Sequence, residues 1–207
     1  MKLKNHFFFI IIILSALLFS YSGNAQQNVH QQSTQYEWPA DEKIKAKLDK
    51  WQDKKFGMII HWGLYAVPGI IESWNLCNED WINRPDSNQS YEDYKKWYWG
   101  LQKDFNPVKF DPEGWAKAGK DAGMKYLVFT TKHHDGFCMF DTKQTDFSIA
   151  NGPFKNNAKA DVAKYVFDAF RKNDFMIGAY FSKPDWHTEN YWWPKYATAN
   201  RNNNYDI

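Results

Sequence analysis

The feature that most constrains the fold is a regular alternation of short apolar runs with amphipathic segments. Nearly uninterrupted apolar runs cover residues 56–62, 126–131 and 175–181. Segments with helical spacing of apolar residues, 112–122 and 158–172, separate them in turn. Strands that are apolar on both faces are typical of parallel sheets covered by helices. The order strand, helix, strand, helix, strand therefore predicts an α/β domain with a parallel sheet.

Local signals define the ends of the helices. Asp111 is a suitable N-cap, Pro112 occupies the first helical position, and Gly123 stands just past the last turn. Two further helices are expected at residues 41–55 and 91–101. The second of these lies within a long irregular stretch after the first strand, and loops of that length are usually functional.

The N-terminal segment differs in character from the rest of the chain. Residues 1–25 combine two lysines, an apolar run at 7–19 and small residues before a cleavage point, which is typical of a secretory signal. The apolar run is shorter than the roughly 20 residues that span a bilayer, although a retained anchor stays an alternative. We expect a signal peptide at 1–25, a flexible leader at 26–40, a folded region at 41–207, and a secreted or periplasmic location.

Charge and cysteine content exclude some classes of protein. The chain has 26 Lys and Arg against 24 Asp and Glu, and removal of residues 1–25 takes away two lysines and no acid. A balanced charge without a basic cluster argues against a nucleic-acid partner. Cys77 and Cys138 are too few for a disulfide scaffold, and whether they pair stays open.

Aromatic residues are unusually frequent. They make up 19% of the 207 residues and include 11 tryptophans. Tryptophan and tyrosine offer a flat apolar face with a hydrogen-bonding edge, which suits the mixed surface of a sugar, although many of them must also fill the core. The composition therefore favours a carbohydrate ligand.

Polar side chains follow each of the three expected strands. His61 follows the first strand, the cluster from Lys132 to Asp135 follows the second, and Tyr180 and Ser182 end the third. The carboxyl ends of parallel strands meet at one edge of a sheet, where catalytic residues collect in β/α barrels. These groups are therefore expected to form one site.

The adjacent histidines His133 and His134 could serve a metal or a sugar. Neighbours in a strand point to opposite faces, so both imidazoles could reach one ion only if the backbone turned between them. We therefore expect no metal, and we assign the two imidazoles and Tyr180 to hydrogen bonds with sugar hydroxyls. Glu72 and Trp74 in the loop after the first strand could add an acceptor and a stacking face. A metal-dependent barrel hydrolase that uses His133 and His134 stays an alternative.

Four segments carry a specific resemblance. These run from Lys55 to Gly69 with the string His-Trp-Gly, from Phe105 to Pro112, from Gly123 to Phe137 with the string Thr-Lys-His-His-Asp-Gly-Phe, and from Gly178 to Ser182. In this order they resemble the α-L-fucosidases of glycoside hydrolase family 29, and the resemblance covers almost everything after Trp51.

The resemblance implies a (β/α)8 barrel of the TIM type, of which about three units are present here. It implies hydrolysis of terminal α-linked L-fucose from glycans with retention of configuration, without a cofactor. It also implies a set of substrate-binding residues, namely His61, Glu72, Trp74, His133, His134 and Tyr180. The Glu-Trp pair of the family is only loosely matched, because Glu72-Ser73-Trp74 contains one inserted residue. Which of Glu72 and Trp74 contacts the sugar therefore stays open.

The resemblance also implies that the nucleophilic aspartate and the acid/base follow a fourth strand, beyond Ile207. Asp185 stands close behind the third strand, but it lacks a matched partner carboxylate and is a weak candidate for the nucleophile. We therefore expect a fragment that does not hydrolyse fucosides by itself. A free-standing sugar-binding module without catalysis is the other alternative.

Overall fold

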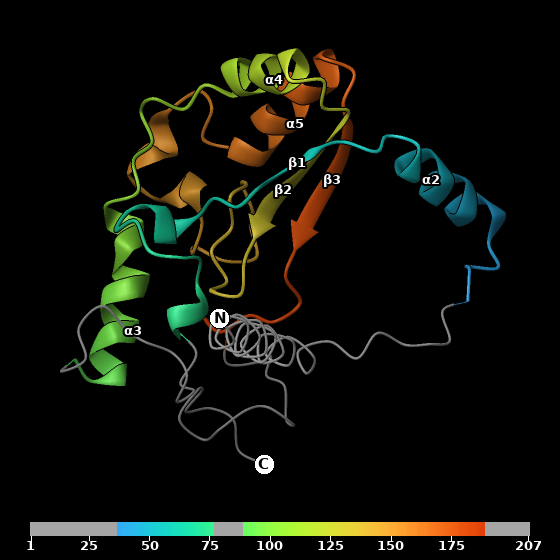
Figure 1. Ribbon diagram of the computed structural model, residues 1–207. Helices are drawn as coiled ribbons and strands as arrows, with labels where there is room; N and C mark the ends of the chain where they lie inside the picture. Colours follow the sequence, from blue (N-terminus) through green and yellow to red (C-terminus); the bar gives the residue numbers. More distant parts are fainter. Residues whose placement is uncertain (1–36, 77–88, 189–207) are drawn as a thin grey trace, which may run out of the picture. The chain divides into compact units, whose positions relative to one another are not determined.

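The computed structural model describes residues 37–76 and 89–188 (Figure 1). The expected signal peptide, most of the leader and Cys77 lie outside these residues. The chain divides into two compact units, residues 1–46 and 47–207. The first helix, α2 (Glu42–Gln52), crosses that boundary and has no buried residue.

A three-stranded parallel sheet forms the centre of the second unit. Its strands are β1 (Met58–Ile60), β2 (Tyr126–Lys132) and β3 (Met176–Phe181), in the spatial order β1-β2-β3. Ile60 lies opposite Phe129, and Thr130 lies opposite Tyr180. The predicted parallel α/β arrangement is confirmed, whereas closure into a barrel stays a prediction.

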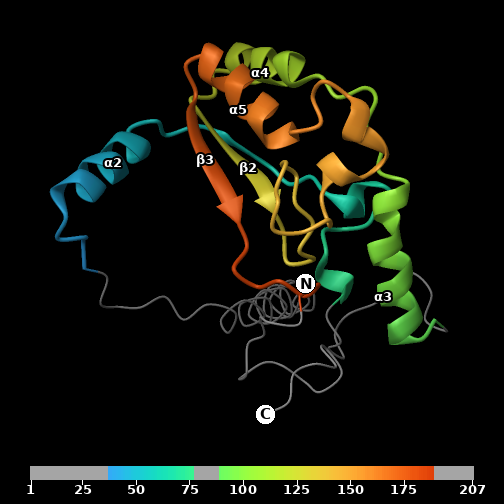
Figure 2. The same cartoon turned by 180° about the vertical axis from the view of Figure 1, so that it is seen from behind.

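Two helices cover one face of this sheet (Figures 1 and 2). They are α4 (Pro112–Asp121) and α5 (Val162–Lys172), which pack against each other, and α5 also packs on β2 and β3. The Asp111 side chain caps α4 by accepting from the Gly114 N–H, as the sequence predicts. The helix α5 was expected to begin at residue 158. It begins at Val162 because the Asp161 side chain accepts from the Lys164 N–H and so fixes the first turn.

The remaining helices lie in the connections. The helix α3 (Tyr91–Gly100) is capped by Ser90, whose side chain accepts from the Asp93 N–H, and it agrees with the expected helix at 91–101. Short 3-10 helices complete the description, namely η1 (Leu64–Ala66), η2 (Trp74–Leu76), η3 (Leu101–Lys103), η4 (Ile149–Asn151) and η5 (Pro153–Asn156).

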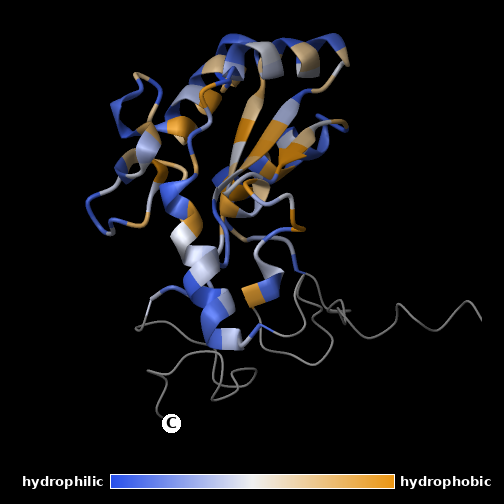
Figure 3. Ribbon diagram, turned by 90° about the vertical axis from the view of Figure 1, so that its left-hand side faces the viewer, coloured by the Kyte–Doolittle hydropathy of each residue, from blue (hydrophilic) through white to orange (hydrophobic). Residues whose placement is uncertain are grey.

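Apolar residues from the strands and helices form one core. Leu127 and Phe129 of β2 are wholly buried, together with Val166 and Phe170 of α5. Hydrophobic residues gather in the strands, whereas much of α3 is hydrophilic (Figure 3). Tyr94 and Tyr98 of α3 are also buried, so part of the aromatic content serves packing, as the composition allowed. Across the described residues, the helices are too short or too polar to span a membrane.

Truncation of the central core side chain is expected to be costly. Phe129→Ala should lower the free energy of unfolding by about 3–5 kcal/mol, because it leaves a cavity beneath α5. Ile59→Ala is the control, since this side chain is 55% exposed and its loss should cost under about 0.5 kcal/mol. Urea unfolding measures both values. Equal losses in the two variants would contradict the packing described.

Candidate active site

The carboxyl ends of the three strands meet at one edge of the sheet, and the chain turns sharply after β2. Regular pairing of β2 with β3 is interrupted between Thr130 and Lys132, and the strand ends at Lys132. Beyond it, the Gly136 N–H donates to the His133 carbonyl. The Trp186 N–H donates to the His134 carbonyl at 2.7 Å, so the segment after β3 is tied to the same turn.

His133 lies at the centre of the site. Its side chain is only 3% exposed, and its ring stacks on Tyr180 with centroids 5.7 Å apart. The Nδ1 atom lies 2.5 Å from the Ser73 hydroxyl oxygen. The Nε2 atom lies 3.4 Å from Oε2 of Glu72. Both ring nitrogens therefore face groups from the loop that follows β1.

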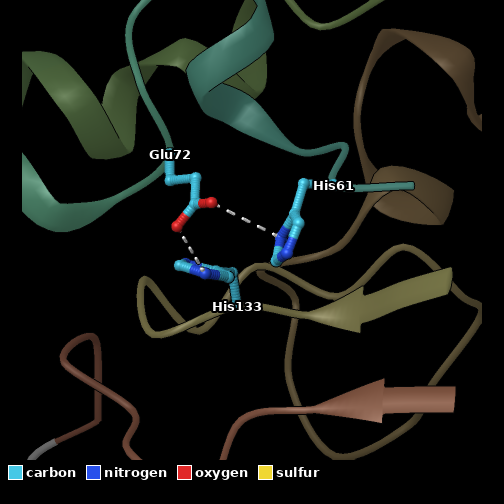
Figure 4. Close-up of side chains that lie close together, drawn as sticks. All are labelled: His61, Glu72 and His133. Carbon is cyan, nitrogen blue, oxygen red and sulfur yellow. Dashed lines mark ion pairs between the residues drawn. The ribbon is translucent and has the colours of Figure 1, made fainter. Parts of the chain in front are cut away.

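The Glu72 carboxylate lies between His61 and His133 (Figure 4). Its Oε1 atom is 3.9 Å from Nδ1 of His61, which in turn lies 3.1 Å from the Thr130 hydroxyl oxygen. The Trp74 indole N–H donates to Oε2 of Glu72 at 2.9 Å. Glu72 and Trp74 thus both reach the histidines, despite the extra residue between them.

His134 lies beside His133 instead of pointing away from it. The two ring centroids are 4.3 Å apart, and Nδ1 of His134 is hydrogen-bonded to the Ser182 hydroxyl. Trp74 and Trp186 both contact the His134 ring. The expected divergence of the two imidazoles was wrong, because strand alternation ends at Lys132 and a turn follows. All six residues expected from the sequence lie in one cluster: His61, Glu72, Trp74, His133, His134 and Tyr180.

Sequence reasoning missed two residues that contact this cluster. Ser73 and Trp186 contact the histidines, yet neither belongs to the expected set. Trp186 could have been found as an aromatic residue in the loop after the third strand, next to Asp185. Ser73 could have been found by its place in the chain, since it stands between Glu72 and Trp74.

Contacts of two acidic side chains, half-buried Asp185 and buried Asp135, hold the backbone of the site. Lys132, whose side chain is 5% exposed, pairs with Oδ2 of Asp185 at 3.3 Å, and Oδ1 of Asp185 accepts from two backbone N–H groups. Asp135 accepts from the Tyr98 hydroxyl at 2.7 Å and from the Phe137 N–H. Asp185 is therefore engaged in holding the loop after β3.

Burial keeps the two central imidazoles neutral. Loss of water lowers the pKa of His133 to about 3, and the neighbouring His134 adds to the effect. Burial, followed by the charge of Lys132, lowers the pKa of His134 to about 4. Neutral imidazoles offer one donor and one acceptor each, which suits directional hydrogen bonds to hydroxyl groups.

The chemistry of the donor set also fits a metal ion. One donor atom each from His61, Glu72 and His133 lies within 4.8 Å of the others. Two imidazoles and a carboxylate resemble the ligand set of catalytic zinc sites. In the metal alternative, the candidate ligands are therefore His61, Glu72 and His133, and no longer the pair His133 and His134.

Comparison with known proteins shows the family of the chain. The family described as Alpha-L-fucosidase matches residues 23–206. The chain belongs to the α-L-fucosidase family. An α-L-fucosidase from Branchiostoma floridae is 33% identical over 149 residues, which are 67% of this chain and 32% of that protein.

Solved structures agree with this assignment. α-L-Fucosidase isoenzyme 1 from Paenibacillus thiaminolyticus superimposes with a TM-score of 0.56 at 41% identity, over 71% of this chain and 31% of that one. A family 29 α-L-fucosidase from Bacteroides thetaiotaomicron, trapped as a covalent intermediate, gives a TM-score of 0.56 at 32% identity, over 77% of this chain and 34% of that one. The chain spans about 30% of the length of the curated α-L-fucosidases that it matches.

Gly136 provides a test of how closely the turn of this fucosidase-family site is packed. Gly136 and Gly123 both have φ near +80°, but an added Cβ meets nothing within 4 Å at Gly123. At Gly136 it would collide with Oδ1 of Asp185 and lie 2.9 Å from the His187 Cβ. Gly123→Ala should cost about 1–2 kcal/mol of unfolding free energy. Gly136→Ala should cost about 1–3 kcal/mol more, as measured by urea unfolding. Equal costs would contradict the contact with Asp185.

The buried titratable groups predict how stability depends on pH. The pKa values of His133 and His134 are lowered on folding, so protons bind preferentially to the unfolded chain and stability falls as pH drops below about 6.5. Burial raises the pKa of Asp135 from 3.8 to about 6, which acts in the opposite direction between those values. The two histidine shifts together exceed the aspartate shift. The urea midpoint should therefore be lower at pH 5 than at pH 7.

A double variant separates the effect of the two histidines on stability from the effect of Asp135. In His133→Asn/His134→Asn the loss of stability between pH 7 and pH 5 should shrink, or reverse under the influence of Asp135. An unchanged pH dependence in this variant would assign the acid sensitivity to other groups.

Proposed function

We propose that the chain forms the fucose-binding side of the active site of a retaining exo-α-L-fucosidase, which removes terminal α-linked L-fucose from glycans. The observation that carries the proposal is the convergence of His61, Glu72, Trp74, His133, His134 and Tyr180 from three strand ends and one loop. Family membership supports it. The three parallel β/α units would be part of a (β/α)8 barrel, whose active sites lie at this end of the strands.

The geometry suits a small hydroxylated ligand. The imidazoles of His133 and His134 are neutral, and because Nδ1 of each is bonded to a serine, Nε2 of each is the nitrogen that can bond a sugar hydroxyl. The Glu72 carboxylate is 30% exposed and can accept from two hydroxyls at once. Trp74 is 39% exposed and offers an apolar face beside the histidines, against which the C–H surface of a pyranose can stack.

Retention of configuration requires two carboxyl groups about 5 Å apart, one as nucleophile and one as acid/base. The Bacteroides relative was trapped as a covalent intermediate, which is consistent with this scheme for that protein. In the described part of this chain, Glu72 faces the histidines, Asp135 is bonded to Tyr98, and Asp185 is paired with Lys132. We therefore assign no nucleophile or acid/base among these residues.

The domain organisation and location belong to the same proposal. Residues 1–25 would be a signal peptide and 26–40 a leader, followed by the catalytic region from residue 41. The N-terminal pattern supports a secreted or periplasmic location for this enzyme, which would act on fucosylated glycans.

L-Fucose binding to the 207-residue chain tests the proposal, with isothermal titration calorimetry as the measurement. Glu72→Gln and His133→Ala should each weaken binding about tenfold or more, because hydrogen bonds to charged or buried groups contribute about 1.5–3 kcal/mol. Lys164→Ala is the control, since this exposed residue of α5 lies outside the site and pairs with Asp168. Its affinity for L-fucose should match that of the parent chain.

Three further results would count against the proposal. Failure of the parent chain to bind L-fucose would remove its basis. Turnover of an aryl fucoside that Asp185→Asn abolishes would assign the chemistry to Asp185. Loss of L-fucose binding on addition of a chelator would favour a metal at His61, Glu72 and His133, the alternative that their 4.8 Å grouping permits.

A further inference from the structure

Ser73 stands between two of the residues that were expected to bind the sugar. It lies between Glu72 and Trp74 and is wholly buried, although the tryptophan after it is 39% exposed. Its hydroxyl oxygen lies 2.5 Å from Nδ1 of His133. Ser73 is therefore buried in the site and contacts the imidazole of His133.

The backbone turns sharply at Glu72. Glu72 has φ of +47°, a left-handed conformation that non-glycine residues adopt at a cost of about 1–2 kcal/mol. Strain of this kind persists where the surroundings hold it, which is common at functional sites. Here the turn lets Glu72 and Trp74 both reach His133, and the Trp74 indole N–H donates to the Glu72 carboxylate. The hydrogen bond from Ser73 lies at the centre of that turn.

The aromatic neighbours of His133 do not by themselves fix the positions of its nitrogens. Tyr65, Tyr180 and His134 contact the ring through their faces and edges. A rotation of the imidazole by half a turn keeps the same outline but exchanges Nε2 with a C–H group. After that rotation a carbon, and not Nε2, would face Glu72 (Figure 4). Only a directional hydrogen bond to one nitrogen distinguishes the two orientations.

We propose that Ser73 is a positioning residue that fixes the orientation and tautomer of His133. The Ser73 hydroxyl donates to Nδ1, so the proton of the ring is carried by Nε2 and is directed at the Glu72 carboxylate and the sugar beside it. The part of this assignment that concerns the sugar rests on the proposed function. The orientation of the ring does not depend on it.

His134 offers a comparison within the same site. Its Nδ1 atom is hydrogen-bonded to Ser182, a buried residue that follows β3. The two neighbouring imidazoles are thus each held at Nδ1 by a buried serine from a different segment. Ser182 therefore provides a matched control, because its removal should release His134 and leave His133 in place.

The test uses the 207-residue chain labelled with ¹⁵N-histidine, and long-range ¹H–¹⁵N spectra that report the protonation of each ring nitrogen. In Ser73→Ala the Nδ1 resonance of His133 should lose its hydrogen-bonded position, while the His134 resonances stay unchanged. Ser182→Ala should show the reverse. Ser73→Thr, which keeps a hydroxyl, should retain the parent His133 resonances. L-Fucose should bind Ser73→Ala about three- to tenfold more weakly than the parent, as the loss of one hydrogen bond implies.

Unchanged His133 ring resonances in Ser73→Ala would overturn the proposal. Parent-like resonances in that variant would mean that Glu72 and the aromatic contacts alone orient the ring. Circular dichroism checks that the variant is folded, and the Ser73→Thr spectrum separates loss of the hydroxyl from loss of packing. If neither the parent nor the variant binds L-fucose, the proposed function fails, while the ring resonances still decide the role of Ser73.

Discussion

Parallel pairing of β1, β2 and β3 is the constraint on which the site depends. Parallel strands must end at the same edge of a sheet, so the residues that follow them are brought together whatever their separation in sequence. His61 and Tyr180 are more than a hundred residues apart, yet their ring centroids lie 5.6 Å from each other. The helices α4 and α5 cover one face of the sheet, where Leu127 and Phe129 are buried.

The site concentrates polar groups where the chain excludes water, and His133, His134, Lys132 and Asp135 are each matched by a partner. His133 and His134 stay neutral and are bonded to Ser73 and Ser182. Lys132 is paired with Asp185, and buried Asp135 accepts from Tyr98. Buried polar groups are costly unless they are hydrogen-bonded, so these contacts are needed for the cluster to remain folded. The same contacts leave Glu72 and Trp74 partly open to a ligand.

Sequence reasoning identified the strands and six side chains that lie together at their carboxyl ends, but erred on local geometry. The period-two rule was applied to His133 and His134 as if the strand continued, whereas β2 ends at Lys132 and a turn follows. The start of α5 was placed too early because apolar spacing alone does not reveal which aspartate caps the helix. Which of Glu72 and Trp74 contacts the sugar stays a prediction, whereas the approach of both to His133 depends on the φ of Glu72, an angle that no motif gives.

The sequence by itself determined the alternation of strands and helices, the caps of α4, and the family strings around His61 and His133. These follow from local periodicity and residue chemistry, which act over a few neighbouring positions. Only the tertiary structure decided that Ser73 is buried against His133, that Asp185 forms an ion pair with Lys132, and that the rings of His133 and His134 contact each other. The first two contacts join segments far apart in the chain, and the third depends on where β2 stops and how the chain then turns.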